Sequence, residues 1–119
     1  MVERRQTFPK QVRLTGRDSF GHVIQKGGFA ADGILVAHVL PNALAYSRFG
    51  ITIPKRTGNA VVRNRWKRHI RESLREIRVD VAQGCDFVIR PKKGAELDAK
   101  QIRRGMIKLL SRAVKRLPS

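Results

Sequence analysis

The side chains in this sequence that are suited to chemistry are mainly cations, and they concentrate between Lys55 and Arg78. That stretch, KRTGNAVVRNRWKRHIRESLREIR, holds nine of the 26 Lys and Arg residues and only two acids, Glu72 and Glu76. The whole chain of 119 residues carries a formal net charge of +17. Such an excess of positive charge attracts phosphates strongly and in a salt-dependent way. The sequence therefore predicts a polyanionic partner, and nucleic acid is the class that this chemistry favours.

The acids and histidines do not predict catalysis by the chain alone. A metal-dependent nuclease needs clustered carboxylates, whereas the nine acids here are scattered along the sequence. A metal-free ribonuclease needs a general acid and a general base, often two histidines, and His22, His38 and His69 fall on three different predicted elements. The sequence has no Walker loop, no Cys/His spacing typical of zinc and no Ser-His-Asp signal. We therefore predict no catalytic residue and no metal site in the protein itself.

The cations of residues 59–77 fall on one side of a predicted helix. The face expected to pack on a sheet comprises Val62, Trp66, Ile70, Ser73 and Ile77. The far face contains no acid and comprises Asn64, Lys67, Arg68, Arg71 and Arg75. A solvated charged face is the alternative, but ordinary surface helices mix both signs, so this stripe favours contact with phosphates. The helix N-terminus near Gly58 and Asn59 adds free backbone N–H groups that suit a phosphate.

The rest of the sequence supplies the elements that must position this helix. We predict a basic, loosely ordered arm over residues 1–14 and a single domain over residues 15–119. Hydrophobic periodicity and the Gly, Pro and Asp-Gly breaks define its helices and strands. The predicted helices lie between Gly16 and Gly27 and over residues 59–77 and 97–117. The predicted strands cover residues 29–30, 34–40, 48–53 and 85–90. The order α-β-β-β-α-β-α predicts an α+β fold with helices packed on one small sheet.

Nothing in the sequence indicates a membrane or an oxidising compartment. The N-terminal MVERRQTFPK lacks the apolar segment of a signal peptide, and no window approaches the ~20 apolar residues of a membrane span. The single Cys85 has no second cysteine with which to form an internal disulfide, which fits a reducing cytosol. Its position before the apolar run Phe87-Val88-Ile89 favours a buried strand residue over a reactive thiol. We therefore expect a cytoplasmic protein with no membrane partner.

The basic stretch resembles the signature of the bacterial ribonuclease P protein component. The matching residues are Lys55-Arg56, Gly58-Asn59-Ala60-Val61, Arg63-Asn64-Arg65, Lys67-Arg68 and Arg71-Glu72. Weaker matches extend the resemblance over nearly the whole chain, and they are Arg13-Leu14 with Phe20 and Val23, and Asp86-Phe87-Val88-Ile89-Arg90. The chain departs from the family's pattern at Pro54, where a small hydroxyl residue is common, and at Ile24 and His38, where aromatic residues are common.

The resemblance implies a function, a set of partners and a fold. Members of that family assist a catalytic RNA that, with bound Mg²⁺, hydrolyses the phosphodiester joining the 5′ leader to precursor tRNA. The implied partners are ribonuclease P RNA, with one protein per RNA, and precursor tRNA, and the Mg²⁺ is expected mainly on RNA. The implied fold has a small mixed sheet in which a left-handed crossover through the basic helix joins two parallel strands, although right-handed crossovers are overwhelmingly common.

The resemblance also assigns site residues. Those implied to contact RNA are Lys55, Arg56, Gly58, Asn59, Arg63, Asn64, Arg65, Lys67, Arg68 and Arg71. Those implied to line a cleft for the single-stranded leader are Phe20, Ile24, His38, Phe87 and Arg90. Aromatic rings in such a cleft would stack bases while cations follow the backbone.

Several alternatives remain open on residue chemistry alone. On residue spacing alone the core is the favoured place for Phe20 and Phe87, with cleft lining as the alternative, and Trp66 is expected in the core. A purely structural RNA-binding protein, such as a ribosomal protein or an RNA chaperone, has a similar size and charge. A DNA-binding protein is the third class, although the sequence shows no convincing helix-turn-helix or other standard DNA motif. The length and spacing of the helical signature favour the ribonuclease P subunit among these three.

Overall fold

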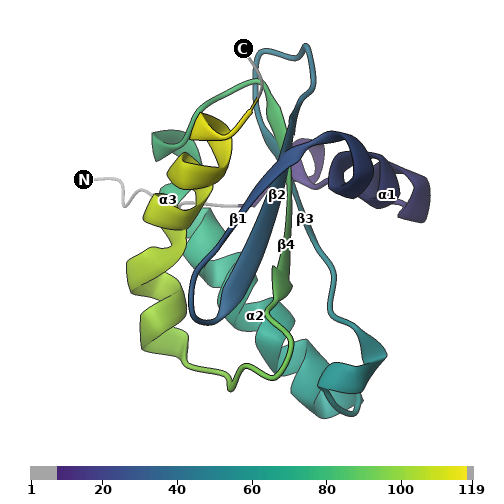
Figure 1. Ribbon diagram of the computed structural model, residues 1–119, viewed down its shortest axis with the longest axis vertical. Coiled ribbons are helices and arrows are strands. Elements are labelled where there is room, and N and C mark those ends of the chain that lie inside the picture. Colours follow the sequence, from purple (N-terminus) through teal and green to yellow (C-terminus); the bar gives the residue numbers. More distant parts are fainter. Residues whose placement is uncertain (1–7, 118–119) are drawn as a thin grey trace.

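The computed structural model describes residues 8–117, in which three α-helices pack on a four-stranded sheet (Figure 1). The elements in chain order are α1 (Arg17–Lys26), β1 (Gly28–Ala31), β2 (Leu35–Pro41), β3 (Arg48–Ile51), α2 (Ala60–Ile77), β4 (Cys85–Pro91) and α3 (Ala99–Lys115). Short 3₁₀ turns cover Lys10–Val12, Lys55–Thr57 and Arg78–Asp80. The predicted α+β class and element order are confirmed, with ends that shift by a few residues.

The sheet is mixed and has the order β1-β2-β4-β3. β1 and β2 form an antiparallel hairpin, β2 is antiparallel to β4, and β3 is parallel to β4. The parallel pair is connected through α2. In Figure 1 both of these strands run downward, β4 lies to the left of β3, and α2 passes behind the sheet. This connection is left-handed, as the family resemblance implies and against the general preference.

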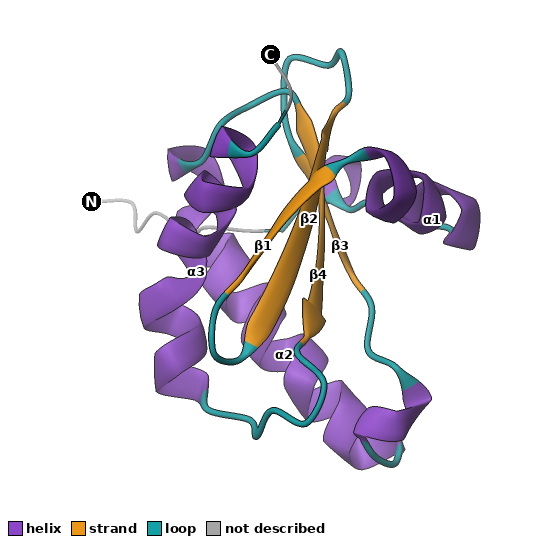
Figure 2. Cartoon of the chain, in the orientation of Figure 1, coloured by secondary structure: helices purple, strands orange, loops and turns teal. Residues whose placement is uncertain are grey.

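The sheet separates two apolar clusters of unequal size, because α2 and α3 cover one face and α1 covers the other (Figure 2). The larger cluster lies under α2 and α3 and includes Phe49, Phe87, Trp66 and Met106. The smaller cluster under α1 consists of Leu14, Val23 and Val88, with Phe20 and Leu40 packed against it. Successive side chains of a strand point to opposite faces, so that the neighbours Phe87 and Val88 belong to different clusters.

Residues 8–14 are packed against the sheet, so the prediction of a loosely ordered arm through residue 14 is wrong for this segment. Phe8, Val12 and Leu14 are buried, and the Leu14 N–H donates to the Phe49 carbonyl at 2.8 Å. The Arg13 side chain folds back and donates to the Phe8 carbonyl at 3.1 Å. The basic residues of this segment suggested an exposed arm, but its apolar residues Phe8, Val12 and Leu14 extend the core. Residues 1–7 of the predicted arm lie outside the described residues.

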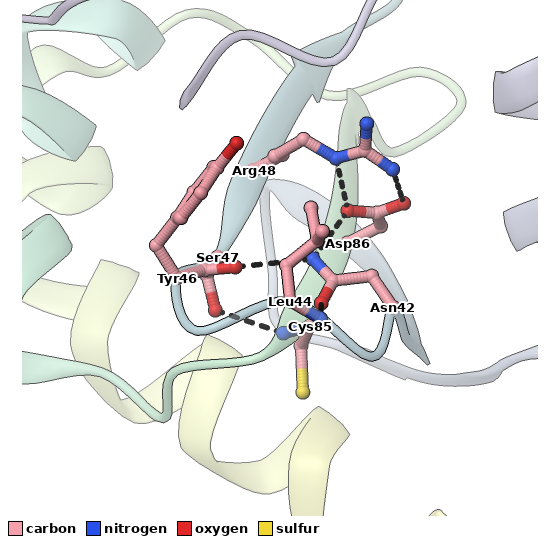
Figure 3. A network of polar contacts seen from close by, with 7 residues as sticks. All are labelled: Asn42, Leu44, Tyr46, Ser47, Arg48, Cys85 and Asp86. Atoms are coloured by element: carbon pink, nitrogen blue, oxygen red, sulfur yellow. Dashed lines mark hydrogen bonds and ion pairs between the residues drawn. The ribbon is translucent and has the colours of Figure 1, made fainter. Parts of the chain in front are cut away.

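A polar network holds the start of β3 beside the start of β4 (Figure 3). The carboxylate of Asp86 accepts hydrogen bonds from Arg48 Nε at 2.8 Å, Arg48 Nη2 at 2.7 Å and Asn42 Nδ2 at 2.8 Å. The hydrogen bonding of Arg48 to Asp86 raises the pKa of Arg48 above its ordinary value. Ser47 Oγ accepts from the Cys85 N–H at 3.0 Å and donates to the Ala82 carbonyl at 2.6 Å. The network therefore fixes the 42–47 loop and the parallel strand pair together.

Candidate nucleic-acid interface

α2 is an amphipathic helix whose sequence explains both its start and its orientation. Asn59 caps its N-terminus, because the side-chain oxygen accepts a hydrogen bond from the Val62 N–H at 3.0 Å and satisfies a backbone donor that the helix leaves free. The residues of α2 that are buried against the sheet and α3 are Trp66, Ile70, Ser73 and Leu74. The predicted packing face is thus confirmed, and Leu74 is an addition to it. Val62 and Ile77, at its edges, are half-buried.

The opposite face of α2 presents the cations to solvent. Asn64, Arg65, Arg68 and Arg71 are exposed, as are Lys55, Arg56 and Asn59 in the preceding turn, whereas Arg63 and Lys67 are half-buried. Arginine predominates in this group, and its planar, forked donors match pairs of phosphate oxygens. Seven of the ten residues predicted to contact RNA are therefore exposed, and all ten lie on one segment of the chain, from the 3₁₀ turn at Lys55–Thr57 along α2.

The turn into α2 depends on Gly58. A Cβ at this position would lie 2.8 Å from both Cβ and Cγ1 of Val62, closer than real side chains approach. The Gly58 carbonyl accepts a hydrogen bond from Arg63 Nε at 3.1 Å, which folds that arginine back along the helix. Beside this turn lies a cavity of about 330 Å³ whose lining includes Arg56, Lys92 and Lys93 and no acid. The two lysines, which follow β4, extend the basic surface and were missed by sequence reasoning because they lie outside the helical signature.

Four of the five residues predicted for the leader cleft lie on the α1 side of the sheet. Phe20 is half-buried on α1, and its ring lies directly over Gly50 of β3, where a Cβ would come within 2.9 Å of Cζ and closer still to Cε1. Ile24, also on α1, has an exposed side chain. His38 is buried on β2, and its Nε2 accepts a hydrogen bond from Arg90 Nε of β4 at 3.2 Å.

The contact with Arg90 fixes the protonation state of His38. Burial, followed by the positive charge of Arg90, holds the pKa of His38 below its ordinary value of 6.5. Since Nε2 is used as an acceptor, the imidazole is neutral with its proton on Nδ1. His38 therefore adds an uncharged ring to this face, and the positive charge there comes from Arg90.

Phe87 does not belong to this face, and its predicted place in the leader cleft is wrong. Its side chain is completely buried and stacks on Phe49, with 5.3 Å between ring centroids, in the core under α2 and α3. The alternative of a core residue is confirmed for Phe87. Cys85, two residues earlier and on the same face, is buried as predicted, and burial raises the pKa of its thiol.

One aromatic residue on the α1 side was missed by the sequence analysis. Phe29 of β1 pairs with His38 of β2 in the antiparallel register, so the two side chains share a face. The side chain of Phe29 is 55% exposed, and its ring centroid lies 5.9 Å from that of His38. The sequence did contain a signal for this residue. Phe29 directly follows the glycine pair Gly27-Gly28 that ends α1, and its neighbour in the strand is the small residue Ala30.

Comparison with known proteins identifies the family. The sequence model described as Ribonuclease P matches residues 8–114. The chain belongs to the ribonuclease P protein family. This family provides the protein subunit of ribonuclease P, the ribonucleoprotein endonuclease that processes tRNA precursors. Membership confirms the function that the resemblance implied, namely that of the protein subunit of a ribonucleoprotein hydrolase that processes tRNA precursors.

Individual ribonuclease P proteins agree with this assignment. The ribonuclease P protein components of Petrotoga mobilis and of Bacillus cereus strain 03BB102 are 37% and 38% identical over 110 and 106 residues. These alignments cover 88% and 87% of this chain and 93% and 92% of the relatives. The solved ribonuclease P protein of Thermotoga maritima superposes with a TM-score of 0.76 at 30% identity, covering 84% of this chain and 96% of the other. A Staphylococcus aureus structure gives 0.74 at 26% identity, covering 90% and 98%.

Two further features concern metal ligands and membrane-spanning helices in the described part of this ribonuclease P protein. Within residues 8–117, no group of three or more His, Cys, Asp or Glu side chains is placed to hold a metal. The helices of the same segment include none with the length and apolar character needed to cross a membrane. The buried acid Asp86 is already engaged by Arg48 and Asn42.

Proposed function

We propose that the protein binds ribonuclease P RNA through the exposed face of α2 and holds the 5′ leader of precursor tRNA on the α1 side of the sheet. The observation that carries the proposal is the acid-free row of exposed side chains at Asn64, Arg68 and Arg71 on a helix whose other face is anchored in the core. A rigid helix presents these cations without the loss of entropy that a disordered basic tail incurs on binding.

The assignment of contacts follows from shape and charge. RNA helices expose phosphates and 2′-hydroxyls over a broad surface that arginine donors can bind without reading sequence. The contact set proposed for the catalytic RNA is Lys55, Arg56, Gly58, Asn59, Arg63, Asn64, Arg65, Lys67, Arg68 and Arg71. A single-stranded leader instead offers bases as well as phosphates, which suits an aromatic and cationic face. Phe20, Ile24, His38 and Arg90 are proposed for that strand.

The metal ion required by the reaction is proposed to be bound by the RNAs. Mg²⁺ prefers hard oxygen ligands such as carboxylates and phosphates, and the acids of this chain form no such cluster within residues 8–117. When bound, Mg²⁺ would activate water and stabilise the charge that develops at the scissile phosphate. The protein contributes by offsetting phosphate repulsion between the catalytic RNA and the precursor, which lowers the Mg²⁺ concentration that their association requires. We further propose one protein per catalytic RNA, acting in the cytoplasm.

Reconstitution tests the proposal. The purified protein is mixed with a bacterial ribonuclease P RNA and a precursor tRNA at low Mg²⁺, beside RNA-only and protein-only controls. We expect cleavage at the leader junction to accelerate only when protein and RNA are both present. Tight RNA binding with no effect on cleavage would instead favour a structural RNA-binding protein, and cleavage by repurified protein alone would contradict the assignment of catalysis to RNA.

A further inference from the structure

We propose that Phe29 stacks on an unpaired base of the precursor leader, next to His38 and Arg90; this inference rests on the proposed function of the α1 face. Phe29 lies outside the residues that match the family signature, and the fold places its ring on the face that carries His38.

The side chain of Phe29 is exposed to solvent. The large apolar side chains that are exposed within residues 8–117 are Ile24, Phe29, Leu44, Val61 and Val79. Phe29 is the one aromatic residue among them. Single exposed apolar residues are common and usually need no explanation. The Phe29 ring differs because it lies 5.9 Å from the ring of His38, which in turn is hydrogen-bonded to a cation.

The backbone that carries Phe29 is held from both sides. On one side β1 pairs with β2, where Phe29 is opposite His38. On the other side α3 covers the outer edge of the strand: Arg116 Nη1 donates to the Phe29 carbonyl at 3.3 Å, and Arg112 Nη2 donates to the Ala31 carbonyl at 2.8 Å. These bonds occupy outward-facing carbonyls that an edge strand otherwise offers to another chain. The ring is thus presented on a fixed backbone, which lowers the entropic cost of stacking.

The neighbours of the Phe29 ring combine an uncharged ring with a cation. Burial, and then the positive charge of Arg90, lower the pKa of His38, and its Nε2 accepts a hydrogen bond from Arg90, so that the ring is neutral. Arg90 is half-buried and supplies a positive charge beside the His38 ring. A nucleotide carries a flat apolar base and a negative phosphate, which match an exposed ring and a nearby guanidinium. A purely apolar partner would leave the charge of Arg90 without a counterpart.

The experiment compares Phe29→Ala and Phe29→Tyr with wild type, each assembled with the catalytic RNA. Affinity is measured for a precursor tRNA with an unmodified leader, for the same precursor with single abasic leader nucleotides, and for mature tRNA. The matched control is Val79→Ala, since Val79 is exposed to a similar extent and lies in the 3₁₀ turn after α2. Thermal unfolding of each free protein checks that the exposed substitutions leave the fold intact.

We expect Phe29→Ala to weaken binding of the leader-bearing precursor by roughly 5- to 100-fold, the range that stacking of one base on an aromatic ring supports. Binding of mature tRNA should not change, and Phe29→Tyr and Val79→Ala should bind as wild type does. One abasic position should weaken wild type and cause no further loss in Phe29→Ala, which would identify the stacked base.

Three results would overturn the inference. They are an unchanged leader preference in Phe29→Ala, an equal loss for mature tRNA, and a change in self-association of the free protein that accounts for the loss. Failure of the proposed function looks different, because wild type itself would then show no preference for the leader-bearing precursor. A wild-type preference that survives in Phe29→Ala rejects the role of Phe29 and leaves the proposed function standing.

Discussion

The ion pair between Arg48 and Asp86 makes a strong prediction about stability, because this structure contains a second Arg–carboxylate pair in a different environment. Arg48→Met removes two short hydrogen bonds to Asp86 but keeps a long side chain at the start of β3. The carboxylate is then left with one donor from Asn42. Since the Asp86 side chain is only 11% exposed, water replaces the lost donors poorly.

The expected loss is about 2–3 kcal/mol in the free energy of unfolding. Removing one partner of a fully buried pair costs ~3–5 kcal/mol, and the value here is lower because 34% of the Arg48 side chain is exposed. For a domain of this size the loss corresponds to roughly 8–12 °C in Tm. The control is Arg103→Met: Arg103 Nε lies 3.7 Å from Glu76 Oε2, and the side chains are 65% and 47% exposed. An exposed pair of this kind contributes about 0–1 kcal/mol.

Urea unfolding followed by fluorescence measures both losses, because Trp66 is the single tryptophan and is buried in the core. Adding Asp86→Asn to Arg48→Met removes the stranded charge and should cost less than Asp86→Asn costs in wild type. The reasoning would be refuted if Arg48→Met cost no more than Arg103→Met. Equal effects of Asp86→Asn in the two backgrounds would also refute it, since the two side chains would then not be coupled.

Three further predictions concern RNA contact, packing and pH. Arg68→Ala should reduce the slope of log affinity for the catalytic RNA against log salt concentration by about one unit. The control Lys108→Ala on α3 should leave this slope unchanged. If Arg68→Ala also left the slope unchanged, Arg68 would be removed from the contact set. Gly50→Ala should destabilise the protein by about 1–3 kcal/mol in urea unfolding, because the new Cβ overlaps the Phe20 ring. If the variant were as stable as the wild type, the Phe20 ring would be free to move aside. The pKa of His38 is lowered on folding, so the unfolded state binds its proton more readily and wild-type stability should fall as pH drops below 6.5. His38→Gln should flatten this dependence in Tm measurements between about pH 5 and pH 7.5, and an identical slope would contradict the linkage.

The elements themselves were predictable because each is encoded locally. The amphipathic pattern of residues 59–77 needs only one segment of chain to decide which side chains share a face, and the structure places Trp66 and Ile70 inward and Arg68 and Arg71 outward. Helix and strand ends were likewise set by nearby residues, such as the Asn59 cap and the hairpin turn at Asp32, whose carboxylate accepts from the Ile34 and Leu35 N–H groups.

The faces of β4 were not predictable in the same way. The run from Cys85 to Ile89 is apolar on both sides of the strand, apart from Asp86, so a period of two cannot tell which face meets α2 and which meets α1. The family resemblance placed Phe87 in the leader cleft, and the pattern of the strand offered no independent test of that face. Residues 8–14 were misjudged because their order depends on a partner far along the chain, the backbone of Phe49.

The sequence by itself determined the class of partner, the α+β element order and the cationic face of α2, because composition and short-range periodicity are properties of the chain before it folds. Only the tertiary structure decided which residues of separate strands meet. The order β1-β2-β4-β3 brings Phe29, His38 and Arg90 together from three strands, and it pairs Arg48 with Asp86 across a left-handed crossover. Strand order, register and handedness arise from long-range packing of the whole sheet against its helices, which no local pattern encodes.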